Sequence, residues 1–159
     1  MKGISILGST GSIGNQALDV VRENRDKFVV KALSCGRNIE LMKAQISEFE
    51  PQLVVTETAD DAKLLRTYFK DKTRNIEFAY GEEGLLELAR YDADLLLNSL
   101  SGMRGMLPTY EAIKARRNIA LANKESLVAG GDVIMSSAAE KEIKILPVDS
   151  EHSAIFQCM

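Results

Sequence analysis

The sequence predicts an α/β protein whose doubly wound, mostly parallel sheet carries helices on both faces. Short apolar runs alternate with longer segments of helical period along the chain, which is the pattern of parallel strands joined by crossover helices. The run Leu95-Leu96-Leu97 is apolar without alternation, as expected of a central strand covered on both faces. A chain of 159 residues, 45% of them hydrophobic, can bury one sizeable core. Length alone therefore predicts one domain.

The first half of the chain contains four predicted strands and three predicted helices. Apolar runs predict strands over residues 4–7, 28–33, 53–55 and 76–79. Apolar residues at helical spacing predict helices over residues 13–23, 39–49 and 59–69. The stripe expected to be buried in the first helix consists of Ile13, Ala17, Val20 and Val21, and that in the second of Ile39, Met42, Ile46 and Phe49. Pro51 ends the second helix and introduces the next strand.

The second half continues the alternation. A short helix is predicted over residues 84–89, followed by the apolar strand 95–97. Pro108 stands where a proline starts a helix, and that helix is expected to run to about Ala115. The remaining predicted elements are a strand over 119–122, a partly helical segment over 125–142 that is broken at Gly130-Gly131, and a strand over 143–148.

Charge and cysteine content exclude several classes of protein. The formal net charge is −3, which gives no reason to expect nucleic acid or an anionic membrane as a partner. Two distant cysteines do not make a disulfide framework and predict reduced thiols. No apolar run approaches the ~20 residues of a membrane-spanning helix, and the N-terminus reaches a glycine-rich loop too soon for a signal peptide. These features predict a cytoplasmic protein.

The glycine-rich loop from Gly8 to Gly14 lies between the first predicted strand and the first predicted helix. Glycines in this place allow a tight turn and a close approach of a pyrophosphate to the backbone, while the helix N-terminus faces the anion. The spacing is G-x-x-G-x-x-G, with Ser9 in place of the usual first glycine of G-x-G-x-x-G. The context predicts a dinucleotide site of the Rossmann type; the alternative is a purely structural turn.

The end of the second predicted strand indicates which dinucleotide binds. Enzymes that use NAD usually place an acidic residue there, which holds the ribose 2′-hydroxyl. Here residues 34–38 contain no acid and one arginine, Arg37. A guanidinium can pair with a 2′-phosphate through two hydrogen bonds, so NADP is favoured over NAD. The alternative is that Arg37 is a solvated surface charge.

An acidic segment follows the last predicted strand, where ligands bind in open α/β sheets. Asp149 and Glu151 are separated by one residue, so in an extended chain both carboxylates face the same side. Such oxygens suit Mg²⁺ or Mn²⁺. Alternatively, Asp149 caps a helix whose first turn contains Glu151. His152 is the only histidine, which excludes sites that need several imidazoles.

Two other strand ends carry polar residues. Lys124 follows the strand 119–122 at an expected helix start, where a cation is unfavourable. This conflict suggests a ligand such as a phosphate or a carbonyl oxygen, and the alternative is an ordinary surface charge. The small polar residues of segment 98–102 close another strand and are expected to shape the cofactor cleft.

Three segments together resemble the 1-deoxy-D-xylulose 5-phosphate reductoisomerase family. They are residues 8–14, 119–128 and 145–157. The resemblance covers essentially the whole chain but only the N-terminal part of the family. It implies a Rossmann-like NADPH-binding domain over residues 1–147, with residues 148–159 beginning a catalytic domain that binds metal and substrate.

The resemblance also implies an activity. The complete protein would be an oxidoreductase of isoprene biosynthesis that rearranges 1-deoxy-D-xylulose 5-phosphate and reduces the product with NADPH to 2-C-methyl-D-erythritol 4-phosphate. The implied cofactors are NADPH and a divalent cation, which can be Mg²⁺, Mn²⁺ or Co²⁺. The implied assembly is a cytoplasmic homodimer with a small sugar phosphate as substrate and no nucleic acid or membrane partner.

The resemblance assigns roles to individual residues. The pyrophosphate would be held by Thr10, Gly11, Ser12 and Ile13. The 2′-phosphate end would be held by Gly36, Arg37 and Asn38, although many members carry Lys at the position of Arg37. Further cofactor contacts would come from Asn123 and Glu125. The substrate would be bound by Lys124, Ser150 and Glu151, of which Lys124 and Glu151 are the implied catalytic residues. The metal ligands would be Asp149 and Glu151.

The family takes a third metal ligand and its substrate-phosphate residues from sequence beyond Met159. We therefore expect this chain to bind NADPH without catalysing the reaction. Two alternatives stand beside this expectation. A semialdehyde dehydrogenase needs a nucleophilic cysteine, and neither Cys35 nor Cys158 is well placed for this role. A stand-alone NADP-binding module without catalytic activity is the other alternative.

Overall fold

The computed structural model describes residues 1–72, 75–122 and 124–148, and for 124–129 it describes the backbone alone. These residues form a seven-stranded sheet in the order β4-β3-β2-β1-β5-β6-β7. The strands are β1 Lys2–Leu7, β2 Phe28–Ser34, β3 Leu53–Thr56, β4 Glu77–Tyr80, β5 Leu95–Asn98, β6 Asn118–Leu121 and β7 Ile145–Pro147. All paired strands are parallel, so the predicted doubly wound α/β fold is confirmed.

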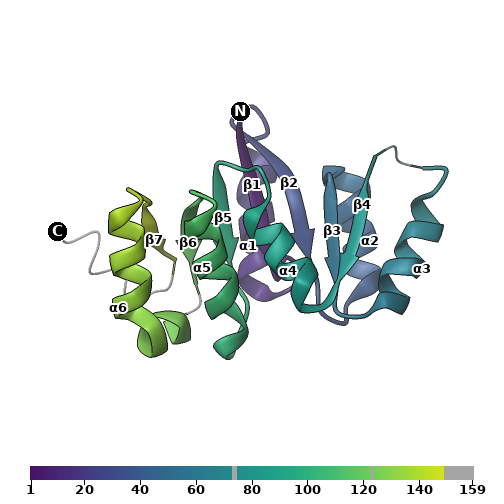
Figure 1. The fold of residues 1–159 in the computed structure, drawn as a ribbon. Helices are drawn as coiled ribbons and strands as arrows, with labels where there is room; N and C mark the ends of the chain where they lie inside the picture. Colours follow the sequence, from purple (N-terminus) through teal and green to yellow (C-terminus); the bar gives the residue numbers. More distant parts are fainter. Residues whose placement is uncertain (73–74, 123, 149–159) are drawn as a thin grey trace.

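Within the described ranges, six α-helices connect the strands. They are α1 Ser12–Glu23, α2 Ile39–Phe49, α3 Ala59–Phe69, α4 Gly81–Arg90, α5 Met106–Lys114 and α6 Lys124–Glu140, and a 3₁₀ turn, η1 Gly102–Gly105, precedes α5. The helices lie on both faces of the sheet, with α4, α5 and α6 in front of it in Figure 1 and α1 behind it.

Two hydrophobic cores fill the space between the sheet and its helices. One core contains Leu18 of α1, Ile46 of α2 and Leu65 of α3. The other contains Leu88 of α4 and Ile113 of α5, together with buried side chains of α6. Adjacent residues of β1 and β5 point into different cores, which is why these central strands carry no polar alternation.

The direction of the crossovers changes at β1, and this change positions the site. The chain proceeds from β1 outward to β4, returns through α4 to β5 on the other side of β1, and then proceeds outward to β7. Ligands in such sheets bind beyond the carboxyl ends of the strands at this switch point. Because Leu7 pairs with Asn98 and Ile6 with Leu33, the three central strands end at nearly the same level.

Several details differ from the prediction, besides shifts of a few residues at element ends such as the start of α4 at Gly81 instead of residue 84. Val20, placed on the buried stripe of the first helix, is 53% exposed, whereas Leu18 is buried. The fifth helix begins at Met106, with Pro108 in its first turn, where a proline is tolerated because its missing N–H would have no intrahelical partner. The 3₁₀ turn η1 was not predicted. Among the helices of the described ranges, none has the length and apolar character needed to cross a bilayer.

Candidate nucleotide-binding site

The glycine-rich loop connects β1 to α1 at the switch point of the sheet. Gly8 has a φ of +80°, a left-handed conformation that favours glycine. A methyl group at Gly14 would lie 2.6 Å from Ser9 Cα, so the first turn of α1 can pack on the loop only because Gly14 has no side chain. Backbone geometry therefore explains two of the three glycines in the predicted motif.

Side chains from the two neighbouring strands fix the loop. The Gly8 N–H donates to Ser34 Oγ at 2.9 Å, and the Ser9 N–H donates to the Ser34 carbonyl oxygen at 2.8 Å. On the other side, Ser99 Oγ donates to the Leu7 carbonyl oxygen at 2.6 Å. The loop is thus attached to the ends of both β2 and β5, and these hydrogen bonds fix its conformation.

A buried glutamine of α2, which was not predicted as a site residue, also holds the loop. Gln45 is 4% exposed. Its Nε2 donates to the Ser9 carbonyl oxygen at 3.0 Å and to Asn15 Oδ1 at 3.1 Å, and its Oε1 accepts from Ser9 Oγ at 2.7 Å. Gln45 therefore links α2 to both the loop and the first turn of α1. The only signal in the sequence was a polar residue on the buried side of a helix.

The N-terminus of α1 is open to an anion. The N-cap residue is Gly11, which has no side chain to cap the helix, and no acidic residue lies in the first turn. The first N–H groups of a helix lack intrahelical acceptors and carry the positive end of the helix dipole, so they attract phosphate. Gly11 and Ser12 are exposed, while Thr10 and Ile13 are partly buried. The four predicted pyrophosphate contacts therefore surround one accessible helix N-terminus.

The three residues predicted to bind the 2′-phosphate follow β2. Gly36, Arg37 and Asn38 are all exposed. Asn38 Oδ1 accepts from the Leu41 N–H at 3.1 Å and thereby caps α2. The Arg37 side chain is 96% exposed, so a ligand at the carboxyl edge of the sheet can reach its guanidinium from solvent.

A carboxylate lies near Arg37, although residues 34–38 contain no acid. Glu57 follows β3, the strand that pairs with β2. Its Oε2 is 3.9 Å from Arg37 Nε, and its Oε1 is 3.4 Å from Arg104 Nη1. This acid comes from the end of an adjacent parallel strand, so the sequence of the segment after β2 gives no sign of it.

Cys35 is the free cysteine of the described chain, and it is buried directly after β2. Burial raises the pKa of its thiol to about 12, and the nearby carboxylates of Asp61 and Glu57 act in the same direction. A nucleophilic cysteine needs the opposite shift. Among the described residues, this argues against the thiol chemistry of a semialdehyde dehydrogenase.

Asn98, at the end of β5, is fully buried and stabilises the turn that follows it. Its Nδ2 donates to the Gly105 carbonyl oxygen and to Thr109 Oγ1, both at 2.8 Å. Its Oδ1 accepts from the Leu100 N–H at 3.2 Å. Asn98 thus shapes the loop that flanks the site and does so from inside the protein.

The predicted substrate and metal residues are mostly outside the described part of the chain. Lys124 is the first residue of α6, at the helix start that was expected, and α6 has non-helical backbone at Gly130, within the predicted break. The side chains of Lys124 and Glu125 are not described. The remaining candidates outside the described residues are Asn123, Asp149, Ser150, Glu151, His152 and Cys158.

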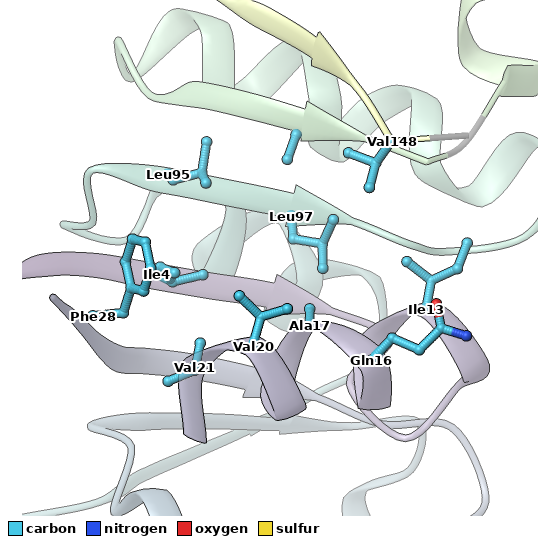
Figure 2. A pocket seen from close by; sticks show the side chains of 11 residues that line it. Ile4, Ile13, Gln16, Ala17, Val20, Val21, Phe28, Leu95, Leu97 and Val148 are labelled. Carbon is cyan, nitrogen blue, oxygen red and sulfur yellow. The ribbon is translucent and has the colours of Figure 1, made fainter. Parts of the chain in front are cut away.

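An apolar groove runs along the sheet beside α1 (Figure 2). It is lined mainly by aliphatic side chains of α1, β1, β5 and β6, together with Val148. Figure 2 shows Ile13 and Val148 toward the carboxyl ends of the strands and Phe28 and Leu95 toward the opposite end. Val20 and Val148 line the groove and remain exposed. This explains why Val20 belongs to an apolar stripe without being buried.

The all-parallel sheet, its switch point and the anchored glycine-rich loop define a Rossmann-like α/β domain. A family model described as 1-deoxy-D-xylulose 5-phosphate reductoisomerase matches residues 4–131. The reductoisomerase of that name from Shouchella clausii is 52% identical over 160 residues, which cover 100% of this chain and 41% of that protein. The chain therefore belongs to the 1-deoxy-D-xylulose 5-phosphate reductoisomerase family.

Solved structures agree with this assignment. The reductoisomerase from Zymomonas mobilis in complex with NADPH has a TM-score of 0.92 and 34% identity, over 99% of this chain and 41% of that one. A DOX-P reductoisomerase in complex with NADPH, fosmidomycin and magnesium has a TM-score of 0.94 and 34% identity, over 100% of this chain and 39% of that one. The chain thus spans about two fifths of the length of its relatives.

Proposed function

We propose that this chain is the NADPH-binding part of a reductoisomerase that converts 1-deoxy-D-xylulose 5-phosphate to 2-C-methyl-D-erythritol 4-phosphate. The observation that carries the proposal is a pre-formed anion site. The glycine-rich loop is fixed by Ser34, Ser99 and Gln45 and opens onto a helix N-terminus without a side-chain cap. The proposed reaction is that of the family to which the chain belongs, and the relatives crystallised with NADPH support the choice of cofactor.

The described residues fit this cofactor. The pyrophosphate would lie on the N–H groups at the start of α1, held by Thr10, Gly11, Ser12 and Ile13. A side chain at Gly14 would displace Ser9 and close this cradle. The adenosine 2′-phosphate would lie near the exposed guanidinium of Arg37, with Gly36 and Asn38 beside it. When bound, NADPH supplies the hydride for the reduction, and these residues orient it.

The substrate and metal half of the site is proposed from the sequence. Lys124 begins α6 at the carboxyl end of β6, where its charge would stabilise an anionic oxygen of the substrate. Asn123 and Glu125 would contact NADPH. Asp149 and Glu151 would bind Mg²⁺, Mn²⁺ or Co²⁺, with Ser150 and Glu151 on the substrate; the relative crystallised with magnesium supports a divalent cation. The complete protein would act as a cytoplasmic homodimer, as the family resemblance implies.

We infer that residues 1–147 form the nucleotide domain and that residues 148–159 begin a second one. The apolar groove beside α1 supports this boundary. Val148 lines the groove, so the chain leaves the sheet at the groove itself, and residues 154–159 are mostly apolar. The relatives are more than twice as long as this chain, which provides the polypeptide to cover the groove. The occupant we propose is the segment that follows Val148.

Nucleotide titrations of the purified 159-residue chain test the proposed function. We expect NADPH to bind more tightly than NADH, and Arg37→Ala to reduce this preference because the 2′-phosphate loses its cation. The same chain should not oxidise NADPH in the presence of substrate and Mn²⁺, whereas the complete protein should. NADPH oxidation by residues 1–159, or unchanged discrimination in Arg37→Ala, would contradict the proposal.

A further inference from the structure

Two arginines from distant parts of the sequence converge on one carboxylate beside the nucleotide site. Arg37 follows β2, and Arg104 belongs to η1, which follows β5. Glu57 lies within ion-pair distance of both of them, with Oε2 3.9 Å from Arg37 Nε and Oε1 3.4 Å from Arg104 Nη1. The two guanidinium groups are therefore neighbours in space, although the residues lie far apart in the sequence.

The position of this cluster relates it to the cofactor. β2, β3 and β5 all end at the carboxyl edge of the sheet, and β1 with its glycine-rich loop lies between β2 and β5. Arg37 lies at the strand end where the adenosine ribose of a dinucleotide is held in this class of fold. Arg104 reaches the same place from the other side of β1. A ligand that contacts Arg37 there would thus be within reach of a second cation.

The pairing within the cluster is loose. Both distances to Glu57 exceed the 2.7–2.9 Å that is usual for charge-assisted hydrogen bonds. The side chains of Arg37 and Arg104 are 96% and 55% exposed, and exposed ion pairs contribute little to stability. A dianionic phosphate with three oxygens can accept hydrogen bonds from two guanidinium groups. Such a ligand would compete well with a single carboxylate for both arginines.

We propose that Arg104 is a second specificity-determining residue, which binds the 2′-phosphate of NADPH together with Arg37, and that Glu57 holds both arginines in place until the phosphate displaces it. This inference rests on the proposed function, since it concerns the same cofactor. It assigns the choice of NADPH over NADH to a pair of cations rather than to the residues after β2 alone.

The test compares the dissociation constants of NADPH and NADH for the wild type and Arg104→Met. Loss of one charged contact should weaken NADPH binding about tenfold and leave NADH binding unchanged. Arg104→Lys should recover part of the loss, because the charge remains without the planar fork. The matched control is Arg90→Met, which removes another exposed arginine, on α4, that pairs with the carboxylates of Glu83 and Glu111. It should change neither constant.

The other outcomes are equally specific. Equal weakening of NADPH and NADH by Arg104→Met would overturn the proposal and indicate stacking of the guanidinium on the adenine ring. An unchanged NADPH constant would also overturn it. Glu57→Gln should tighten NADPH binding severalfold by removing the competing anion; weaker NADH binding in this variant would show instead that Glu57 holds the ribose hydroxyl. If the wild type binds neither nucleotide, the proposed function fails, independently of Arg104.

Discussion

Gln45 and Ser9 are joined by two hydrogen bonds, one to the side chain and one to the backbone of Ser9. Gln45 Oε1 accepts from Ser9 Oγ at 2.7 Å, and Gln45 Nε2 donates to the Ser9 carbonyl oxygen at 3.0 Å. Both residues are buried. The glutamine therefore satisfies these two buried polar groups of Ser9, and the position of the loop depends on α2.

We predict that Gln45→Glu destabilises the protein by ~1–3 kcal/mol at neutral pH, because a buried carboxylate cannot donate to the Ser9 carbonyl oxygen. NADPH binding should weaken as well, since the loop loses its support. Urea unfolding and nucleotide titration measure the two effects. Gln52→Glu is the control, because Gln52 is exposed and should tolerate the charge. Equal effects of the two variants would disprove the supporting role of Gln45.

We predict that Gly14→Ala destabilises the protein by roughly 1–3 kcal/mol, the usual cost of overpacking. The new methyl group would lie 2.6 Å from Ser9 Cα, which is backbone and cannot rotate away. The control is Gly131→Ala, where a methyl group would meet nothing within 4 Å and where a better helix former should be neutral or slightly stabilising. Thermal unfolding distinguishes them. A Gly14→Ala variant with unchanged stability and NADPH affinity would refute the close packing.

Much of the fold could be predicted because the signals were local. The second and third helices have the predicted bounds, 39–49 and 59–69, since apolar residues at helical spacing mark them and Pro51 follows the end of the second. The break at Gly130 was equally visible in the sequence. Val20 was assigned to a buried face because its stripe is apolar, but periodicity cannot say whether a partner element covers that face within the described residues.

The site was less predictable because its contacts connect strand ends that are distant in sequence. The glycine-rich loop and Arg37 were found from the local motif. The contacts of Gln45, Glu57 and Arg104 were not predicted, since only the sheet order brings α2 to the loop and η1 to the end of β3. Asn38, which was expected to bind the 2′-phosphate, also caps the N-terminus of α2. The assignments of Asp149 and Glu151 stay predictions, because both lie outside the described residues.

We predict that the Cys35 thiol resists alkylation up to pH 9. Its pKa is raised to about 12 from 9.0, so at pH 9 the folded protein would hold only about a thousandth of its thiol as thiolate. The folded state binds the proton more tightly, so the associated stability is present below pH 9 and is lost as the pH rises toward 12. Iodoacetamide labelling of a Cys158→Ser variant, native and in urea, measures this. Rapid labelling of the native form would contradict the buried thiol.

We predict that Val20→Asp destabilises the complete protein by ~1–3 kcal/mol, because the segment after Val148 would bury an unpaired charge against the apolar groove. Val20 is 53% exposed in the described chain, and Leu64 of α3, at 47%, is a matched control outside the groove. Leu64→Asp should change stability by less than ~0.5 kcal/mol, as exposed substitutions usually do. Thermal unfolding of both variants gives the comparison. If the two substitutions have the same effect, the groove is open to solvent in the complete protein, and the boundary proposed at Val148 loses its structural support.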